Sequence, residues 1–303
     1  MTEPDTPATE AVSARYNGLD TWESTDVLHA MWEGQAAAVA ALRPVLPALA
    51  RAGDAMAARL AASRHGRFVY AGAGTSARLG VQDGVELVPT FHWPPERLAY
   101  LVAGGAPALT RAIEGAEDDG DAAARAVADA RIGADDVLVG LAASGSTRFT
   151  VQALTAGAAA GALTVAIANA PEAPLLAAAH HPILIETGAE VIAGSTRMKA
   201  GTAQRAALTL LSSLVMVRLN RVHDNLMVDV EATNAKLVAR AERLVRRLTG
   251  CDLTAARTAL EACQGRVKAA VLVIDGADPE GAEQLLADTG GSLRRARTAL
   301  GEI

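Results

Sequence analysis

Three short segments combine glycine with hydroxyl side chains directly ahead of apolar runs. They are GAGTSARLG at 72–80, SGST at 144–147 and GSTRMKAGT at 194–202. Glycine lets backbone N–H groups approach a ligand closely, and Ser and Thr hydroxyls donate hydrogen bonds to an anion. Where such a segment opens a helix, the helix dipole also favours negative charge. Each segment alone is typical of a helix cap or turn, but together they predict a site for a phosphorylated small molecule.

The spacing within these segments does not indicate a nucleotide site. GAGTSARLG is not a GxGxxG followed by an acidic residue about 20 positions later, and no segment ends in the GK[ST] of a P-loop. The expected ligand is therefore a small phosphorylated metabolite held by hydroxyls and backbone amides.

Two groups of carboxylates are candidates for acid–base chemistry. Glu86 stands among Val, Leu and Pro in VQDGVELVPT, and apolar surroundings favour the neutral form of a carboxyl group, which suits an acid catalyst. Its alternative interpretation is a surface carboxylate on a short helix. The second group is the acidic run IEGAEDDGDAA at 113–123, for which a solvated turn is the alternative.

The sequence lacks the residue patterns of metal sites, of paired cysteines and of serine hydrolases. The six histidines form no HExxH or similar ligand pattern, so we expect no metal. Cys251 and Cys263 belong to no CxxC pattern and are expected to be buried free thiols. No GxSxG occurs, which argues against a serine hydrolase of the nucleophile-elbow type.

Composition narrows the class of protein further. The chain has 303 residues, half of them hydrophobic, which is enough for one large α/β domain and a small appendage. A net charge of −6 argues against a nucleic-acid partner. The polar N-terminus resembles no signal peptide, and no run of about 18 uncharged apolar residues occurs. We therefore expect a cytoplasmic protein without a membrane span.

The order of elements predicts the fold class. Short apolar runs ending in small residues predict five strands, at 67–74, 96–105, 135–144, 161–170 and 181–187. Ala-rich helical stretches separate most of them, which indicates right-handed βαβ crossovers and a mainly parallel five-stranded sheet in a three-layer α/β/α fold. Ligands of such sheets bind at the carboxyl ends of the strands, where the three hydroxyl segments fall.

Helices are expected on either side of this sheet region. Residues 24–63 are predicted to be helical, with Ser24 or Thr25 as N-cap, and 200–248 to be helical with a break near RVHDNL. Three or four short helices complete the chain. The predicted domains are an N-terminal arm at 1–20, an α/β domain with the phosphate-binding segments at 21–248 and a small C-terminal helical bundle at 249–303.

Four segments resemble successive signatures of the N-acetylmuramic acid 6-phosphate etherases, of the sugar isomerase (SIS) superfamily. They are GAGTSARLGVQDGVELVPTF, GLAASGST, GAEVIAGSTRMKAGTAQ and NLMVDVEATNAKL. The resemblance extends from about Thr9 to the C-terminus. It implies a SIS-type fold and a lyase without cofactor or metal, active as a homodimer on a phosphorylated amino sugar in peptidoglycan recycling. The implied reaction releases D-lactate from the sugar by elimination and then adds water.

The resemblance also implies roles for particular residues. Glu86 aligns with the family's acid–base glutamate, and the second catalytic carboxylate is Glu117 or Asp118. The implied phosphate and substrate contacts come from all three hydroxyl segments: Gly74, Thr75, Ser76, Ser144, Ser146, Thr147, Ser195, Thr196 and Lys199. Arg197 and Lys199 either face the ligand or brace their loop.

Some motif positions differ from the family pattern. SGRTP reads SGSTR at 144–148, and the N-terminal TE.RN reads TEAVS at 9–13. Two alternatives to the etherase therefore stay open: a phosphosugar isomerase or lyase of altered specificity, and a non-catalytic phosphosugar-sensing regulator similar to the glucokinase regulatory protein. D-lactate release distinguishes the etherase from both.

Overall fold

A computed structural model describes residues 9–229 and 235–301 of the chain. The chain divides into two compact units, each described here by itself. The first contains Met1–Gly84 and Glu96–Ser212, and the second contains Val85–Pro95 and Ser213–Ile303. The domain boundaries expected from the sequence, after residues 20 and 248, stay a prediction.

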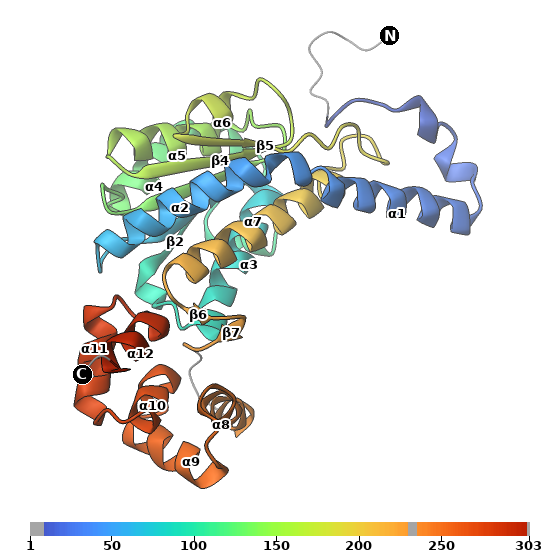
Figure 1. The fold of residues 1–303 in the computed structure, drawn as a ribbon. Helices are drawn as coiled ribbons and strands as arrows, with labels where there is room; N and C mark the ends of the chain where they lie inside the picture. Colours follow the sequence, from blue (N-terminus) through green and yellow to red (C-terminus); the bar gives the residue numbers. More distant parts are fainter. Residues whose placement is uncertain (1–8, 230–234, 302–303) are drawn as a thin grey trace. The chain divides into compact units, whose positions relative to one another are not determined.

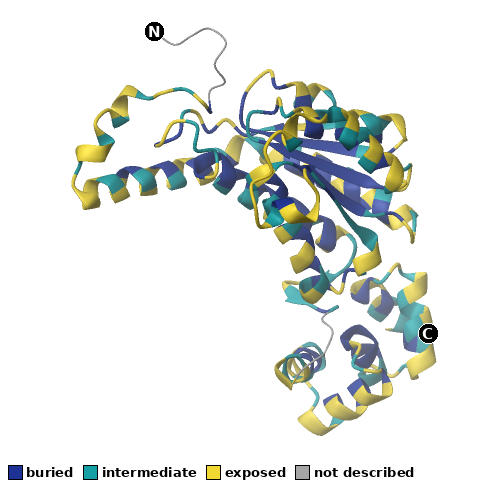
Figure 2. Cartoon of the chain, turned by 180° about the vertical axis from the view of Figure 1, so that it is seen from behind, coloured by how far each residue is buried: buried dark blue, intermediate teal, exposed yellow. Residues whose placement is uncertain are grey.

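The first unit is built on a parallel sheet, drawn from cyan to green in Figure 1. Its strands are β1 (Phe68–Gly72), β2 (Leu98–Val102), β3 (Val137–Ala142), β4 (Leu163–Ala168) and β5 (His181–Leu184). The strand order is β2-β1-β3-β4-β5, and all neighbouring pairs are parallel. Every residue of β1 and β3 is buried, which explains their unbroken apolar sequences (Figure 2). The five predicted strands are confirmed.

Helices cover both faces of this sheet. They are α2 (Leu46–Ala62), α3 (Gly74–Phe91), α4 (Gly120–Asp129), α5 (Arg148–Ala159), α6 (Pro174–Ala177) and α7 (Lys199–Arg218). Helix α1 (Ser24–Ala40) instead extends away from the sheet (Figure 1). Alternate strand residues such as Val69 and Leu138 share a core cluster with α4 and α5. Tyr70, the next residue along β1, points to the other face of the sheet and donates a hydrogen bond to Asp83 of α3. The predicted three-layer α/β/α class is confirmed (Figure 1).

The buried carboxylate of Asp83 joins α3 to α7 within the first unit. It accepts hydrogen bonds from Tyr70 at 2.8 Å, from Ser212 at 3.2 Å and from Arg205 at 3.2 Å. Burial raises the pKa of Asp83 even though all three partners favour its charged form. These bonds connect the two helices to each other and to β1.

Helix α1 begins one or two residues earlier than the sequence predicted. Glu23, in an extended conformation, is the N-cap, and its carbonyl accepts from the N–H groups of Asp26 and Val27. Ser24 is the first helical residue, so the predicted N-cap at Ser24 or Thr25 is wrong. No side-chain cap is present at this helix start. Residues 9–22 form turns and two short 3-10 helices, η1 (Ala14–Tyr16) and η2 (Leu19–Thr21), consistent with an irregular arm.

The second unit contains the last residues of α3, a small hairpin and a helical bundle. The hairpin pairs β6 (Val222–His223) with β7 (Leu226–Met227), at the predicted break in the long helix. The bundle helices are α8 (Ala235–Thr249), α9 (Leu253–Ala262), α10 (Val267–Ile274), α11 (Pro279–Asp288) and α12 (Leu293–Gly301). Part of the signature NLMVDVEATNAKL, residues 230–234, lies outside the described residues.

The bundle has a hydrophobic core of its own. Its buried side chains come from every bundle helix and include Val245, Leu260, Val271, Leu272, Ala282 and Leu293. Asp252 and Asp278 cap α9 and α11 by accepting from backbone N–H groups at 2.8 Å. Cys263 is buried, as predicted, and burial raises its pKa, whereas Cys251 is only half-buried; both thiols are free.

One helical stretch meets simple criteria for a membrane span. Residues 24–62 are long enough and have a window of mean hydropathy 1.2, although only 28% of that window is buried. These criteria give a weak indication, because helices of globular domains also meet them. Here the stretch is interrupted by the 3-10 turn η3 (Arg43–Val45), and Leu49, Met56 and Leu60 of α2 are buried in the core.

An ion pair anchors the start of β3 beside β1. Asp136, 4% exposed, accepts from the Arg67 guanidinium at 2.7 Å and from the backbone N–H of Gly133 at 3.0 Å. Burial opposes the ionisation of Asp136, yet these hydrogen bonds hold its pKa below the usual value. A lowered folded-state pKa means that the ionised carboxylate stabilises the fold above about pH 4, and that this stabilisation is lost as pH falls through the folded value.

Replacing Asp136 by Asn should therefore lower the free energy of unfolding at pH 7 by about 1–3 kcal/mol, because the Arg67 charge loses its partner. The difference from the native protein should shrink as the pH falls below about 4. Urea unfolding at both pH values measures this, with Asp135→Asn as a matched control at the exposed neighbouring carboxylate. An equal loss at both pH values would contradict the assignment.

Candidate active site

The three hydroxyl segments follow carboxyl ends of strands in the one parallel sheet, as predicted. Gly74 to Ser76 open α3 directly after β1, and Ser144 to Thr147 lie between β3 and α5. Ser195 and Thr196 lie in the longer loop between β5 and α7. Gly74 has φ 53° and Gly145 φ 69°, a left-handed backbone that favours glycine at both turns.

Some of the predicted ligand hydroxyls are already used inside the protein. Ser76, buried, donates to the side-chain carbonyl of Gln204 at 2.8 Å. Ser144 Oγ accepts from both the hydroxyl and the backbone N–H of Ser146, at 3.0 and 3.3 Å. These contacts hold the loops in shape. The hydroxyls of Ser76 and Ser144 can still hydrogen-bond to a ligand, but their existing hydrogen bonds restrict how they rotate.

The remaining hydroxyls make no side-chain hydrogen bond within the described residues. They belong to Thr75, Thr147, Ser195 and Thr196, all partly exposed. Thr147 occupies the N-cap position of α5 without capping it through its side chain. Hydroxyls placed at the sheet edge and not used by the fold are the donors that a phosphate needs.

Two residues that the sequence analysis did not single out connect these loops. Gln204 of α7 accepts a hydrogen bond from the Ser76 hydroxyl through Oε1, and its Nε2 donates to Asn169 Oδ1 at 3.0 Å. Asn169, just after β4, donates from Nδ2 to the Ile185 carbonyl at 3.0 Å, and its backbone N–H donates to Ala143. All three side chains of this polar chain are buried. The sequence did contain features that could have pointed to both residues. Asn169 is a polar residue directly after an apolar strand, and Gln204 ends the AGTAQ motif.

The β5–α7 loop is closed by a buried carboxylate. Glu190, 1% exposed, accepts from the backbone N–H groups of Lys199 and Ala200 at 2.8 and 2.9 Å, and so satisfies the first amides of α7. The Lys199 ammonium donates to the Thr187 carbonyl at 2.6 Å. Burial lowers the pKa of Lys199, and the nearby Glu190 opposes that shift. The geometry favours bracing over ligand contact for Lys199, although its predicted substrate contact stays a prediction.

The β1–α3 and β5–α7 loops lie close together at the start of α7. A Cβ atom added to Gly201 would come within 3.3 Å of the Thr196 carbonyl and 3.7 Å of the Thr75 methyl group. Thr75 and Thr196, whose hydroxyls make no other side-chain hydrogen bond within the described residues, therefore both lie close to Gly201.

The two alternatives for the second carboxylate line different cavities. Glu117 lines a cavity of about 320 Å³ together with Gly74 and Thr75. Asp118 lines one of about 570 Å³ with Ser146 and Arg148. Arg78 frames the first cavity, because its guanidinium donates to the carbonyls of Ala108 and Leu109 at 2.9 and 3.1 Å. Only Glu117 of the pair shares a cavity with the start of α3.

Glu86 lies in the last turns of α3, within the second unit. Its side chain is exposed and makes no hydrogen bond within the described residues. The apolar enclosure expected from its sequence neighbours is therefore wrong for the single chain. Leu87 is buried, but Val85 on the other side of Glu86 is 53% exposed. The catalytic role of Glu86 stays a prediction.

No cluster of three or more His, Cys, Asp or Glu side chains in the described part of the chain has a geometry suited to a metal ion. The groups at the sheet edge are hydroxyls, backbone amides and carboxylates. Such a set can bind a phosphorylated polyol and move protons on it.

Two family models match parts of the chain. The N-terminal SIS domain of the glucokinase regulatory protein matches residues 52–158, and the SIS domain matches residues 117–214. The second match includes the SGST segment and the β5–α7 loop, and the first includes GAGTSARLG.

Curated relatives match the chain over nearly its whole length. The N-acetylmuramic acid 6-phosphate etherase of Deinococcus radiodurans is 51% identical over 303 residues, covering 100% of this chain and 97% of that protein. The etherase of Streptomyces coelicolor is 45% identical, covering 97% and 94%. That of Edwardsiella ictaluri is 42% identical, covering 98% and 96%.

Replacing Lys199 by Met tests whether this lysine braces the loop. The substitution keeps the aliphatic stem but leaves the Thr187 carbonyl without its donor, so the free energy of unfolding should fall by about 1–3 kcal/mol. Arg197→Met, which removes an exposed cation two positions earlier, is the control and should change stability by less than about 0.5 kcal/mol. Urea unfolding compares them. Equal stabilities of the two variants would show that the buried ammonium has no bracing role.

Proposed function

The chain belongs to the N-acetylmuramic acid 6-phosphate etherase family, and we propose that it cleaves the D-lactyl ether of N-acetylmuramic acid 6-phosphate. The products are N-acetylglucosamine 6-phosphate and D-lactate, which makes the protein a carbon–oxygen lyase. One water is consumed for each lactate released. The observation that carries this proposal is the cavity in which Glu117 meets Gly74 and Thr75, because it combines a carboxylate with phosphate donors.

The proposed chemistry follows from the substrate. Opening the sugar ring gives an aldehyde that acidifies the proton on C2. A carboxylate removes that proton, the lactyl oxygen leaves C3, and water then adds at C3. Because an ether oxygen leaves poorly as an anion, a carboxylic acid must protonate it as it departs. The reaction therefore requires two carboxyl groups in different protonation states, which we assign to Glu86 and Glu117.

The phosphate is proposed to bind the unused hydroxyls at the sheet edge. Thr75, Ser195 and Thr196 supply donors near the start of α7, and the first backbone amides of α3 add theirs. The amides at the start of α7 are unsuited to this role because Glu190 already occupies them. Ser76, Ser144, Ser146, Thr147 and Lys199 complete the proposed substrate surroundings, in part by holding the loops.

We further propose that the protein is a homodimer with composite sites. Gly74 belongs to the first compact unit and Glu86 to the second. In the proposed dimer, a sugar held at the start of α3 receives the Glu86 carboxylate of a second copy.

Helix α1 presents a face suited to such a partner. Its buried residues are small, namely Ala30, Gly34 and Ala38. Leu28, Trp32 and Val39 lie on the opposite face by helical spacing and are 64%, 70% and 53% exposed. Large apolar side chains gathered on an exposed face are typical of protein interfaces. Leu210 of α7, 45% exposed, is a second candidate contact.

Two alternatives remain distinguishable by experiment. The first alternative is a sensing role, suggested by the similarity of residues 52–158 to a glucokinase regulatory protein domain, in which the protein would bind phosphosugar and release no lactate. An isomerase would move a proton between C1 and C2 and likewise release none. Identities of 42–51% to proteins named as etherases support the lyase over both. We place the activity in the cytoplasm, where phosphorylated sugars are retained by their charge.

Glu117→Gln should abolish most D-lactate release, because a general acid or base contributes about 10²–10⁴-fold to rate. Asp118→Asn, the matched control one position later, should retain activity because Asp118 lines a different cavity. Coupled D-lactate assays on both variants measure this, with binding of N-acetylglucosamine 6-phosphate by calorimetry to establish that the sites are intact. Loss of activity in Asp118→Asn alone would reassign the second carboxylate.

Trp32→Glu should convert the dimer to monomers, since it places a charge in the centre of the exposed apolar face of α1. Leu210→Glu tests α7 in the same way. Sedimentation velocity at several protein concentrations distinguishes the two helices. A native protein that sediments as a monomer at all concentrations would contradict the dimer proposal.

A further inference from the structure

The end of α3, which carries Glu86, is closed by hydrogen bonds from the N–H groups of His92 and Trp93 to the helix, and it receives further contacts from outside the helix. Pro89 lies in the last turn and has no N–H, so position 89 donates no helical hydrogen bond to the Val85 carbonyl. The helix ends at Phe91, and His92 follows in the left-handed conformation at φ 52°. Because the exposed Glu86 side chain has no hydrogen-bond partner among the described residues, its direction is set by the backbone of these turns.

Arg221 supplies the outside contact. Its guanidinium donates to the carbonyls of Phe91 and His92 at 3.3 and 3.2 Å, and so satisfies the end of the helix. A cation at a helix C-terminus also interacts favourably with the helix dipole. The guanidinium carbon lies 5.7 Å from the ring centre of Trp93, which is 1% exposed, so a cation–π contact holds the same group from another side.

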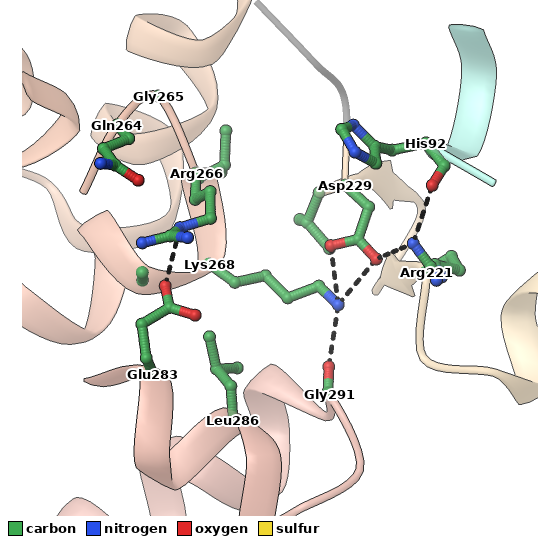
Figure 3. Close-up of a pocket in the computed structure, with 13 residues that line it drawn as sticks. His92, Arg221, Asp229, Gln264, Gly265, Arg266, Lys268, Glu283, Leu286 and Gly291 are labelled. Atoms are coloured by element: carbon green, nitrogen blue, oxygen red, sulfur yellow. Dashed lines mark hydrogen bonds and ion pairs between the residues drawn. The ribbon is translucent and has the colours of Figure 1, made fainter. Parts of the chain in front are cut away.

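Asp229 and Lys268 hold Arg221 in turn. Asp229 pairs with Arg221 at 3.4 Å, and its two oxygens lie 2.8 and 2.9 Å from the Lys268 ammonium (Figure 3). The ammonium also donates to the carbonyls of Asn220 and Gly291, both at 2.9 Å. Its three donors are thereby used. Burial lowers the pKa of Lys268, and Asp229 opposes that shift.

These groups line a cavity of about 450 Å³ rather than a close-packed core. Figure 3 shows the Lys268 side chain extending from α10 across this cavity toward Asp229. In such surroundings the hydrogen bonds and ion pairs, more than packing, determine where Asp229 and Arg221 lie. Loss of the ammonium would remove the hydrogen bonds that place Asp229, and would so weaken one of the contacts that hold Arg221.

We infer that Lys268, Asp229 and Arg221 form a positioning relay, by which the C-terminal helical bundle fixes the end of α3 and the direction of the Glu86 carboxylate. The inference rests on the proposed function, in which Glu86 is catalytic. It gives the bundle a part in the reaction, although no bundle residue in the relay touches the substrate. All members of the relay belong to the second compact unit.

The test compares Arg221→Gln, Arg221→Lys and Lys268→Met with the native protein. Arg297→Gln is the matched control, because Arg297 forms a bundle ion pair with Asp275 at 2.9 Å and contacts no residue of α3. Functional sites are counted first by calorimetric titration with N-acetylglucosamine 6-phosphate, so that a smaller folded fraction is not mistaken for slower chemistry. If Lys268→Met does not fold, Asp229→Asn replaces it.

In Arg221→Gln and Lys268→Met, kcat per site for D-lactate release should fall about tenfold or more, while KM changes little, since a misplaced catalytic group slows chemistry without weakening binding. Arg221→Lys should recover much of the loss, and Arg297→Gln should match the native protein. In a Glu86→Gln background the Arg221→Gln loss should largely disappear, because both changes act through the same carboxylate. Fully additive losses would overturn the relay.

A second readout keeps the relay separate from the proposed function. Amide hydrogen exchange of the peptide spanning 85–95 should quicken in Arg221→Gln and Lys268→Met but not in Arg297→Gln. If the native protein releases no lactate, the proposed function fails, and this exchange still tests the relay. Unchanged exchange at 85–95 in both relay variants would overturn the inference whatever the activity.

Discussion

The buried polar chain from Ser76 through Gln204 to Asn169 is the interaction on which the sheet-edge site depends. Its members come from α3, α7 and the end of β4, and its last bond reaches the carbonyl of Ile185 beyond β5. A buried polar group without a partner costs about 1–3 kcal/mol, so a fully connected chain admits few alternative arrangements. The three hydroxyl loops therefore keep a common geometry because the chain beneath them leaves little room for another.

The sheet edge divides its polar groups between support and binding. Glu190 occupies the amides at the start of α7, and Lys199 holds the Thr187 carbonyl, so this helix start is already neutralised. The hydroxyls of Thr75, Ser195 and Thr196 make no side-chain hydrogen bond within the described residues. In the proposed binding mode, these hydroxyls and the start of α3 hold the ligand phosphate, and Glu117 shares the cavity there. This mode uses donors that make no other side-chain hydrogen bond within the described residues.

Much of this architecture could be predicted from the sequence, because buried parallel strands leave a strong pattern. The five apolar runs and the hydroxyls after them indicated both the sheet and the edge that carries the site. The roles of individual side chains could not be read in this way. Lys199 and Thr196 stand in one motif, yet one is buried and bonded while the other is open, and only the three-dimensional contacts separate them. Glu86 was expected among apolar neighbours, but in a helix the residues adjacent in sequence point to different faces.

The most direct test is D-lactate release from N-acetylmuramic acid 6-phosphate by the purified protein, measured together with formation of N-acetylglucosamine 6-phosphate. The account predicts one lactate and one sugar phosphate for each substrate consumed, and loss of both products in Glu86→Gln. Binding of the sugar phosphate without any lactate would contradict the etherase and favour a sensor. Lactate release undiminished in Glu86→Gln would contradict the assignment of its carboxylate.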